Sequence, residues 1–85
     1  MQEKLILNDG TEITGYCLKD GTQLTLYMPG KTIAEMYPYL SDQTKTVKII
    51  HKNDDKEYTY NNFTHLFSMM EYPDGMLTAG LKKGA

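Results

Sequence analysis

Alternating apolar and polar residues fill the first third of the chain. Three runs show the alternation, over residues 4–8, 11–18 and 23–28, and an Asp-Gly pair separates each run from the next. A period of two is typical of a β-strand with one buried face, and Asp-Gly supplies the positive φ angles that tight hairpins require. Gly15 lies inside the second run, where a glycine often marks a bulge or a sharp bend, as at the corner of a small barrel. We therefore expect an antiparallel β-meander.

A helical pattern follows the meander. Its apolar residues recur at the spacing of one helix face, and they are Ile33, Met36, Tyr37 and Leu40. Thr32 precedes this stretch as a candidate N-cap, and Glu35 lies three residues later, where a capping box requires an acid. Pro38 complicates the pattern, because a proline inside a helix costs about 3 kcal/mol. The sequence therefore predicts a short helix from about Thr32 to Tyr37, with an irregular last turn to Leu40.

Strand patterns return in the second half of the chain. We expect a strand over residues 45–51, a turn, and a returning strand over residues 57–60. A break at 61–64 leads to a final hairpin, in which residues 65–72 and 76–82 pair around a Pro-Asp-Gly turn. These segments continue the antiparallel pattern of the first third.

The elements together predict an α+β fold that is mostly β: an antiparallel meander, one short helix, then further hairpins in a small sheet or barrel-like domain. Roughly six strands are expected. The length indicates a single domain over residues 1–85. The residues expected to form its core are Leu5, Leu7, Ile13, Leu24, Leu26, Ile33, Met36, Leu40, Val47, Ile49, Leu66 and Leu81.

Composition narrows the functional classes. Apolar residues make up 40% of the chain and charged residues 24%, which is typical of a folded globular protein. The net charge is −2, and all nine basic residues are lysines. Because arginine is the usual reader of guanine edges and the usual bidentate clamp on phosphate, its absence argues against sequence-specific nucleic-acid binding. No apolar run is long enough for a transmembrane helix or a signal peptide, so we expect no membrane partner.

Residues suited to catalysis or metal binding are few. His51 and His65 are the two histidines, and neither has a second ligand at helix or strand spacing, whereas zinc needs three or four ligands. The single cysteine, Cys17, lies in phase with Ile13 and is expected to be a small core residue rather than a nucleophile. The Gly-Lys-Thr at residues 30–32 lacks the upstream glycine of a phosphate-binding loop. We therefore predict no catalytic residue, no metal site, no cofactor and no enzyme activity.

Tyrosine and methionine are prominent, with seven and six residues respectively. Both types are enriched at protein interfaces, although a small sheet also needs aromatic residues for its own packing. Met69 and Met70 are neighbours on a strand and must point to opposite faces, so one of them is expected outside the core. Either Met70 and Tyr72 face outward, or Phe67 and Met69 do. The candidate partner-binding residues are Met69, Met70, Tyr72 and Met76 of the last hairpin, with Tyr37 and Tyr39 of the helix.

Several motifs, taken in order, resemble those of one family. The chain has "NDGTE" at residues 8–12 and "KTIAE" at residues 31–35. A third motif is spread over the last third of the chain and consists of Tyr60, Phe63, Thr64, Leu66, Met69, Asp74, Gly75, Leu77 and Leu81. In these motifs, which cover nearly the whole length, the chain resembles short accessory proteins found among the tail genes of phages and prophages of Gram-positive bacteria.

The resemblance implies a non-enzymatic accessory protein that acts by protein–protein binding. The first hypothesis is a structural component associated with the tail or baseplate, which assembles with other tail proteins or with copies of itself. The alternative is a phage-encoded inhibitor of a host defence protein, anti-CRISPR-like, which binds and blocks a bacterial effector nuclease. The protein would accordingly be found in the cytoplasm of the bacterial host or in the virion. Neighbouring tail genes would favour the first hypothesis, and a defence-inhibitor cluster the second.

Overall fold

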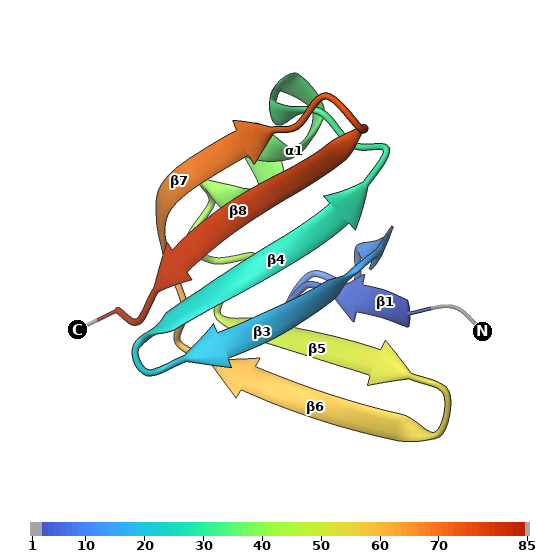
Figure 1. Ribbon diagram of the computed structural model, residues 1–85. Coiled ribbons are helices and arrows are strands. Elements are labelled where there is room, and N and C mark those ends of the chain that lie inside the picture. Colours follow the sequence, from blue (N-terminus) through green and yellow to red (C-terminus); the bar gives the residue numbers. More distant parts are fainter. Residues whose placement is uncertain (1–2, 85) are drawn as a thin grey trace.

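Eight β-strands and one α-helix make up residues 3–84, which the computed structural model describes (Figure 1). Met1, Gln2 and Ala85 of the expected 1–85 domain lie outside the described residues. The fold is α+β and mostly β, as predicted. Its elements are β1 (Glu3–Ile6), β2 (Glu12–Thr14), β3 (Tyr16–Asp20), β4 (Gln23–Pro29), α1 (Ile33–Leu40), β5 (Lys48–Asn53), β6 (Lys56–Asn61), β7 (His65–Glu71) and β8 (Met76–Lys82).

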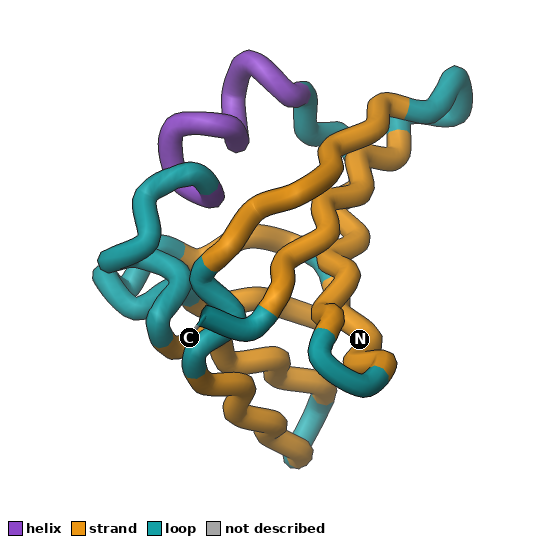
Figure 2. The backbone as a smooth tube through the Cα atoms, turned by 90° about the vertical axis from the view of Figure 1, so that its left-hand side faces the viewer, coloured by secondary structure: helices purple, strands orange, loops and turns teal. Residues whose placement is uncertain are grey.

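Two four-stranded antiparallel sheets enclose the core (Figure 1, Figure 2). One sheet has the strand order β2-β1-β5-β6, and the other has the order β3-β4-β8-β7. The three predicted hairpin turns that carry Asp-Gly connect β1 to β2, β3 to β4 and β7 to β8. The helix α1 lies at one end of the molecule, beside β7. The last hairpin and the helix are therefore neighbours, although about thirty residues separate them along the chain.

The strand predicted over residues 11–18 is two strands, because the chain bends at Gly15 and passes from one sheet to the other. Gly15 has a φ of +154°, and its amide donates a hydrogen bond to the carbonyl of Glu3 at 3.0 Å. A β-carbon at this position would lie 2.3 Å from the carbonyl oxygen of Tyr27, so only glycine fits. The predicted bend is confirmed, and the division it causes contributes to the count of eight strands where about six were expected.

The start of α1 follows the predicted N-cap. The hydroxyl of Thr32 accepts a hydrogen bond from the amide of Glu35 at 3.1 Å, which satisfies one of the free N–H groups of the first turn. The carboxylate of Glu35 lies 3.4 Å from the ammonium of Lys31, one turn earlier. An acid in the first turn also interacts favourably with the helix dipole. The local sequence therefore fixes where this helix begins.

The end of α1 differs from the prediction. The helix continues through Pro38 to Leu40, so the irregular last turn that was expected is wrong. Proline removes one backbone hydrogen bond, but the next turn stays closed because the amide of Ser41 donates to the carbonyl of Tyr37 at 2.9 Å. Met36 and Leu40, four residues apart on one face, are both buried and hold this turn against the core. Packing thus outweighs the local cost of the proline.

The strand predicted over residues 45–51 begins three residues late, at Lys48. A turn at Asp42 is the reason: its carboxylate accepts hydrogen bonds from the amide of Thr44 at 3.0 Å and from the hydroxyl of Thr44 at 2.7 Å. The carbonyl of Asp42 also accepts a hydrogen bond from the amide of Lys45. Val47 therefore precedes the strand and is 40% exposed, which makes its assignment to the core wrong.

The core otherwise follows the predicted alternation. Of the twelve expected core residues, Ile33 and Leu66 are half-buried and pack against the core, and the others except Val47 are buried. Cys17 is buried in phase with Ile13, as expected. The buried apolar residues that the sequence did not assign to the core are Met28, Phe63, Leu77 and Ala79, and the buried polar residues are Thr46 and His51.

Candidate protein-interaction surface

The register of the last hairpin decides which of its side chains face outward. Leu66 pairs with Leu81 and Met69 pairs with Ala79, and all four side chains face the core. A β-bulge lies between Leu66 and Ser68, so that Phe67 is an extra residue in β7. Because of the bulge, β7 can direct Leu66 and Met69 inward and still expose Phe67.

Both of the alternatives left open by the sequence are therefore half right. Met70 and Tyr72 face outward, as in the first, while Phe67 faces outward, as in the second. Met69 faces inward and is half-buried against the core. A strict period of two cannot describe this strand, since the bulge shifts the phase by one residue.

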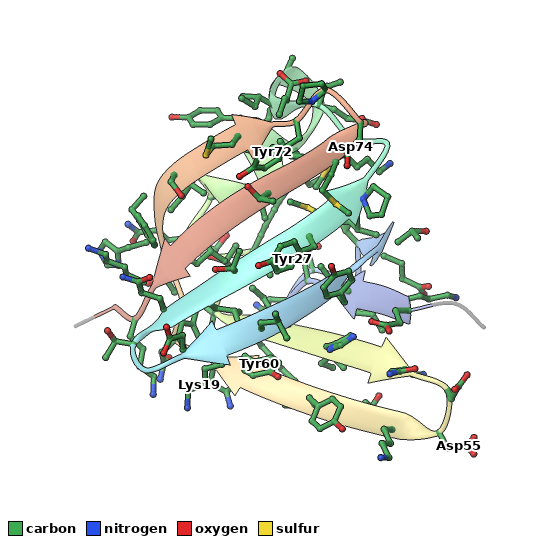
Figure 3. The ribbon with its side chains drawn as sticks, in the orientation of Figure 1. Lys19, Tyr27, Asp55, Tyr60, Tyr72 and Asp74 are labelled. Carbon is green, nitrogen blue, oxygen red and sulfur yellow. The ribbon has the colours of Figure 1, made fainter. Side chains whose placement is uncertain are left out.

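The side of sheet β3-β4-β8-β7 that faces away from the core is called the outer face here (Figure 3). Tyr27 lies near the middle of this face, and Tyr72 lies near the tip of the last hairpin. The outer face consists of Tyr16, Leu18, Asp20, Gln23, Thr25, Tyr27, Pro29, His65, Phe67, Ser68, Met70, Tyr72, Met76, Thr78, Gly80 and Lys82.

Large apolar side chains are exposed on the outer face. Leu18 is 58% exposed, Phe67 46%, Met70 53% and Tyr72 44%. A solvent-facing side of an antiparallel sheet normally carries polar residues, so this composition is unusual. Leu18 lies on the edge strand β3, and Phe67, Met70 and Tyr72 lie on or next to the opposite edge strand β7. Exposed apolar groups concentrated on one face of a protein can mark a binding surface. The outer face is therefore the candidate interaction surface of the described chain.

Two aromatic contacts order the outer face. Tyr16 and Tyr27 are cross-strand partners whose rings stack with centroids 4.7 Å apart and planes 13° apart. The ring of Phe67 lies over Gly80, where a β-carbon would come within 2.9 Å of the ring. The ammonium of Lys82 lies 4.8 Å from the centre of the same ring, a cation–π contact. These contacts restrict the positions of the three rings on the outer face.

A groove adjoins the outer face between α1 and the edge strand β7. Its volume is about 320 Å³, and its lining residues are Ile33, Tyr37, Leu66, Phe67, Ser68 and Met69. The lining is mostly apolar, and Tyr37 on one side and Phe67 on the other are both exposed. The groove thus extends the apolar surface from the sheet onto the helix.

The six predicted partner-binding residues have different surroundings. Met70, Tyr72 and Tyr37 are exposed, and the hydroxyl of Tyr72 donates a hydrogen bond to the sulfur of Met70 at 3.7 Å. Met69 and Met76 are half-buried. Tyr39 is half-buried against the core, with the ammonium of Lys45 4.7 Å from its ring centre. Their role in binding stays a prediction.

Four further residues of the outer face were not among those candidates: Tyr16, Leu18, Tyr27 and Phe67. Tyr27 alternates with the buried Leu26 and Met28, so its outward direction was visible in the sequence. What the sequence did not show is the pairing of β4 with β8, a strand some fifty residues away, which brings the aromatic residues of two hairpins onto one surface.

The residues with potential chemical reactivity are Cys17, His51 and His65, and they lie on three different strands, β3, β5 and β7. Burial raises the pKa of the Cys17 thiol from its ordinary value of 9.0 to about 12, so the thiol stays protonated at neutral pH. His51 is buried, and its Nε2 lies 2.8 Å from a carboxylate oxygen of Glu3. His65 is the first residue of β7, and its Nδ1 lies 3.2 Å from the hydroxyl of Thr64. Within residues 3–84, no three His, Cys, Asp or Glu side chains gather as a metal site would require.

No helix within residues 3–84 has the length and apolar character needed to span a membrane. Comparison of the chain with known proteins finds no matching family model, no similar curated protein and no similar solved structure.

Proposed function

We propose that the protein acts by binding other proteins, as a non-enzymatic accessory protein of a phage or prophage. The observation that carries the proposal is the outer face, on which Leu18, Phe67, Met70 and Tyr72 are exposed together. Such groups gain no hydrophobic free energy while they stay in water, and covering them with a partner provides it. A surface of this kind is suited to assembly.

The assembly we favour is a phage tail or baseplate. This part of the proposal rests on the resemblance of the sequence motifs to tail-gene accessory proteins. The inhibitor of a host defence protein, which would use the same outer face, differs in where the protein is found. A tail component is retained in the finished particle, whereas an inhibitor stays in the host cytoplasm.

Binding is tested by co-expressing the chain with the product of each neighbouring gene and measuring complex mass by light scattering after size-exclusion chromatography. Met70→Ala and Tyr72→Ala should each weaken the complex by tenfold or more, since buried anchors commonly contribute about 2 kcal/mol or more to binding. Both side chains are exposed in the free protein, so the melting temperature should change by only a few degrees.

Val47→Ala is the matched control, because Val47 is an exposed apolar residue outside the outer face. This variant should bind as the unmodified chain does. If Met70→Ala and Tyr72→Ala bind normally and Val47→Ala does not, the outer face is not the binding surface. If none of the gene products and no further copy of the chain binds at all, the proposal of a binding protein fails.

The location is tested by inducing particles from a strain that carries the gene and analysing purified particles by quantitative mass spectrometry. A tail component should be present in a fixed ratio to the major tail protein. Recovery of the chain only in the particle-free lysate would contradict the tail assignment and favour the inhibitor.

A further inference from the structure

The outer face has a chemical asymmetry from one edge to the other. Residues that face one another across the four strands form rows. The row at the C-terminal end of β8, called the lower row here, consists of Asp20 of β3, Gln23 of β4, Lys82 of β8 and His65 of β7. The acid therefore lies at the β3 edge, and the two bases lie toward the β7 edge. Among the residues that the structure describes, neither Asp20 nor Lys82 forms a salt bridge. The row presents opposite charges that are available to a partner.

In the next two rows, the size of the side chains changes from strand to strand. One row contains Leu18, Thr25, Gly80 and Ser68, with the Phe67 ring over Gly80. The next row contains Tyr16, Tyr27, Thr78 and Met70. In both rows β8 contributes the small residues, and the larger ones lie on either side of it.

A second copy of the chain can satisfy this pattern. A two-fold axis that runs parallel to the strands, between β4 and β8, places β3 over β7 of the other copy and β4 over β8. Asp20 then faces His65 of the other copy, with Lys82 of that copy one strand further in, and the ring of Tyr27 faces the small Thr78. In the row between, Leu18 faces Ser68 and lies near the bulged Phe67, and Leu18 and Phe67 are both exposed apolar side chains. The axis thus brings the acid next to the bases and the Tyr27 ring onto a small residue.

The alternative two-fold axis, perpendicular to the strands, matches poorly. It places the charged lower row over the upper end of the sheet, so that Lys82 faces Met76 and His65 faces Tyr72. Ionic groups would then be covered without a partner, at a cost in free energy. The charges therefore favour the parallel axis over the perpendicular one.

The area of the outer face indicates how strongly two copies would bind. Three of the four strands have seven residues and β3 has five. At a spacing of about 4.8 Å between strands and about 3.4 Å per residue, they project roughly 420 Å². This is a small interface by the standards of stable complexes, so a dimer that dissociates in the micromolar range is expected.

Resting on the proposed function, in which the outer face binds protein, we propose that its partner is a second copy of the same chain. The two copies pack face to face about a two-fold axis parallel to the strands, with Asp20 of each opposite His65 and diagonal to Lys82 of the other. The contact is isologous, so each charge pair occurs twice.

Charge reversal tests this arrangement. Sedimentation velocity of the unmodified chain, from about 1 µM to about 500 µM, should show a monomer–dimer equilibrium. Asp20→Lys and Lys82→Glu should each weaken the dimer by tenfold or more, because each places like charges close together at two sites. An equimolar mixture of the two variants should restore it, since the introduced lysine of one variant then lies diagonal to the introduced glutamate of the other, and the native Asp20 and Lys82 also pair.

Asp55→Lys and Lys56→Glu are the matched controls, because both residues are exposed and belong to the β5–β6 hairpin of the other sheet. Asp55 lies in its turn (Figure 3), and Lys56 begins β6. Neither control should change the dimer, alone or mixed. Melting curves of all four variants report whether folding is intact.

Three results would overturn the inference: a monomer at every concentration, a dimer that both reversals leave intact, or a mixture that does not recover. If the chain is monomeric but binds a neighbouring gene product through Met70, the inference fails and the proposed function stands. If it is monomeric and binds nothing, both fail.

Discussion

Gly15 and Tyr27 are in backbone contact at the corner where the chain passes between the two sheets. A β-carbon on Gly15 would lie 2.3 Å from the carbonyl oxygen of Tyr27, closer than such atoms can approach. Gly15→Ala should therefore lower the free energy of unfolding by at least about 2 kcal/mol, because β3 or β4 must shift to make room. Urea unfolding followed by circular dichroism measures the change.

Gly21→Ala provides the comparison for that variant. Gly21 has a φ of +63°, but a β-carbon there meets no atom within 4 Å. Its cost should be limited to the left-handed conformation, about 1 kcal/mol. If the two variants lose equal stability, the contact with Tyr27 does not limit the corner.

Pro38 lies inside α1, where it has no N–H to donate to the carbonyl four residues earlier. Pro38→Ala should raise the free energy of unfolding by about 2 kcal/mol, since the lost helix bond outweighs the benefit that proline gives by restricting the unfolded chain. Thr32→Ala should lower it by about 1 kcal/mol through loss of the N-cap, which confirms that the assay reports on this helix. Thermal melts of both variants test the expectation. Destabilisation by Pro38→Ala would show that the proline ring contributes packing of its own.

Phe63 and Val47 are the two residues whose environments differ most from the prediction. Phe63 is fully buried and makes an edge contact with Tyr60 at a centroid distance of 6.4 Å, whereas Val47 is exposed. Phe63→Ala should lower the free energy of unfolding by about 3–5 kcal/mol, and Val47→Ala should change it by no more than about 0.5 kcal/mol. Equilibrium denaturation of the pair gives the difference directly. Equal effects would be incompatible with the burial of Phe63.

Local sequence patterns were sufficient to predict the hairpins, the bend at Gly15 and the start of the helix, because each of these features is caused by residues close together in the chain. The Asp-Gly turns, Gly15 and the Thr32 cap each act on neighbouring backbone. Val47 was misassigned because alternation alone does not reveal the turn that Asp42 forms with Thr44. Phe63 follows Asn62, whose φ of 69° breaks any periodicity, so no pattern pointed to its burial.

The sequence predicted only part of the candidate site, because the rest depends on contacts between distant segments. The outward direction of Met70 and Tyr72 was one of two phases that the sequence allowed, and the bulge at Phe67 made elements of both correct. The pairing between β4 and β8 depends on core packing between distant segments, as the register Leu26↔Ala79 illustrates. No local signal encodes such a pairing, so the assembly of the outer face became visible only in three dimensions.

Cys17 gives the protein a specific response to alkaline pH. Burial places the folded pKa at about 12, above the ordinary 9.0 of an unfolded thiol. The contribution of the neutral thiol to stability is therefore complete below pH 9 and is lost as the pH rises from 9 to 12. The loss approaches about 1.4 kcal/mol per pH unit in that window.

Cys17→Ala should flatten this alkaline decline, even if it lowers stability at neutral pH by removing a buried side chain. Unfolding free energies of the two proteins at several pH values between about 8 and about 10.5 test the slope. In parallel, the native thiol should resist a thiol-reactive dye at neutral pH and react after denaturation. Rapid labelling of the native protein would contradict the burial of Cys17.

The central place of β8 in its sheet constrains how the protein is made. β8 lies between β4 and β7 and contributes Leu77, Ala79 and Leu81 to the core, although it is the last strand in chain order. A nascent chain therefore cannot close this sheet until residues up to Lys82 have left the ribosome. Until then the facing edges of β4 and β7 have no strand between them, and the apolar side chains that β8 helps to cover stay exposed. The sheet β3-β4-β8-β7 therefore forms only after β8 has been synthesised. A translational pause before β8 would prolong the exposure and favour aggregation.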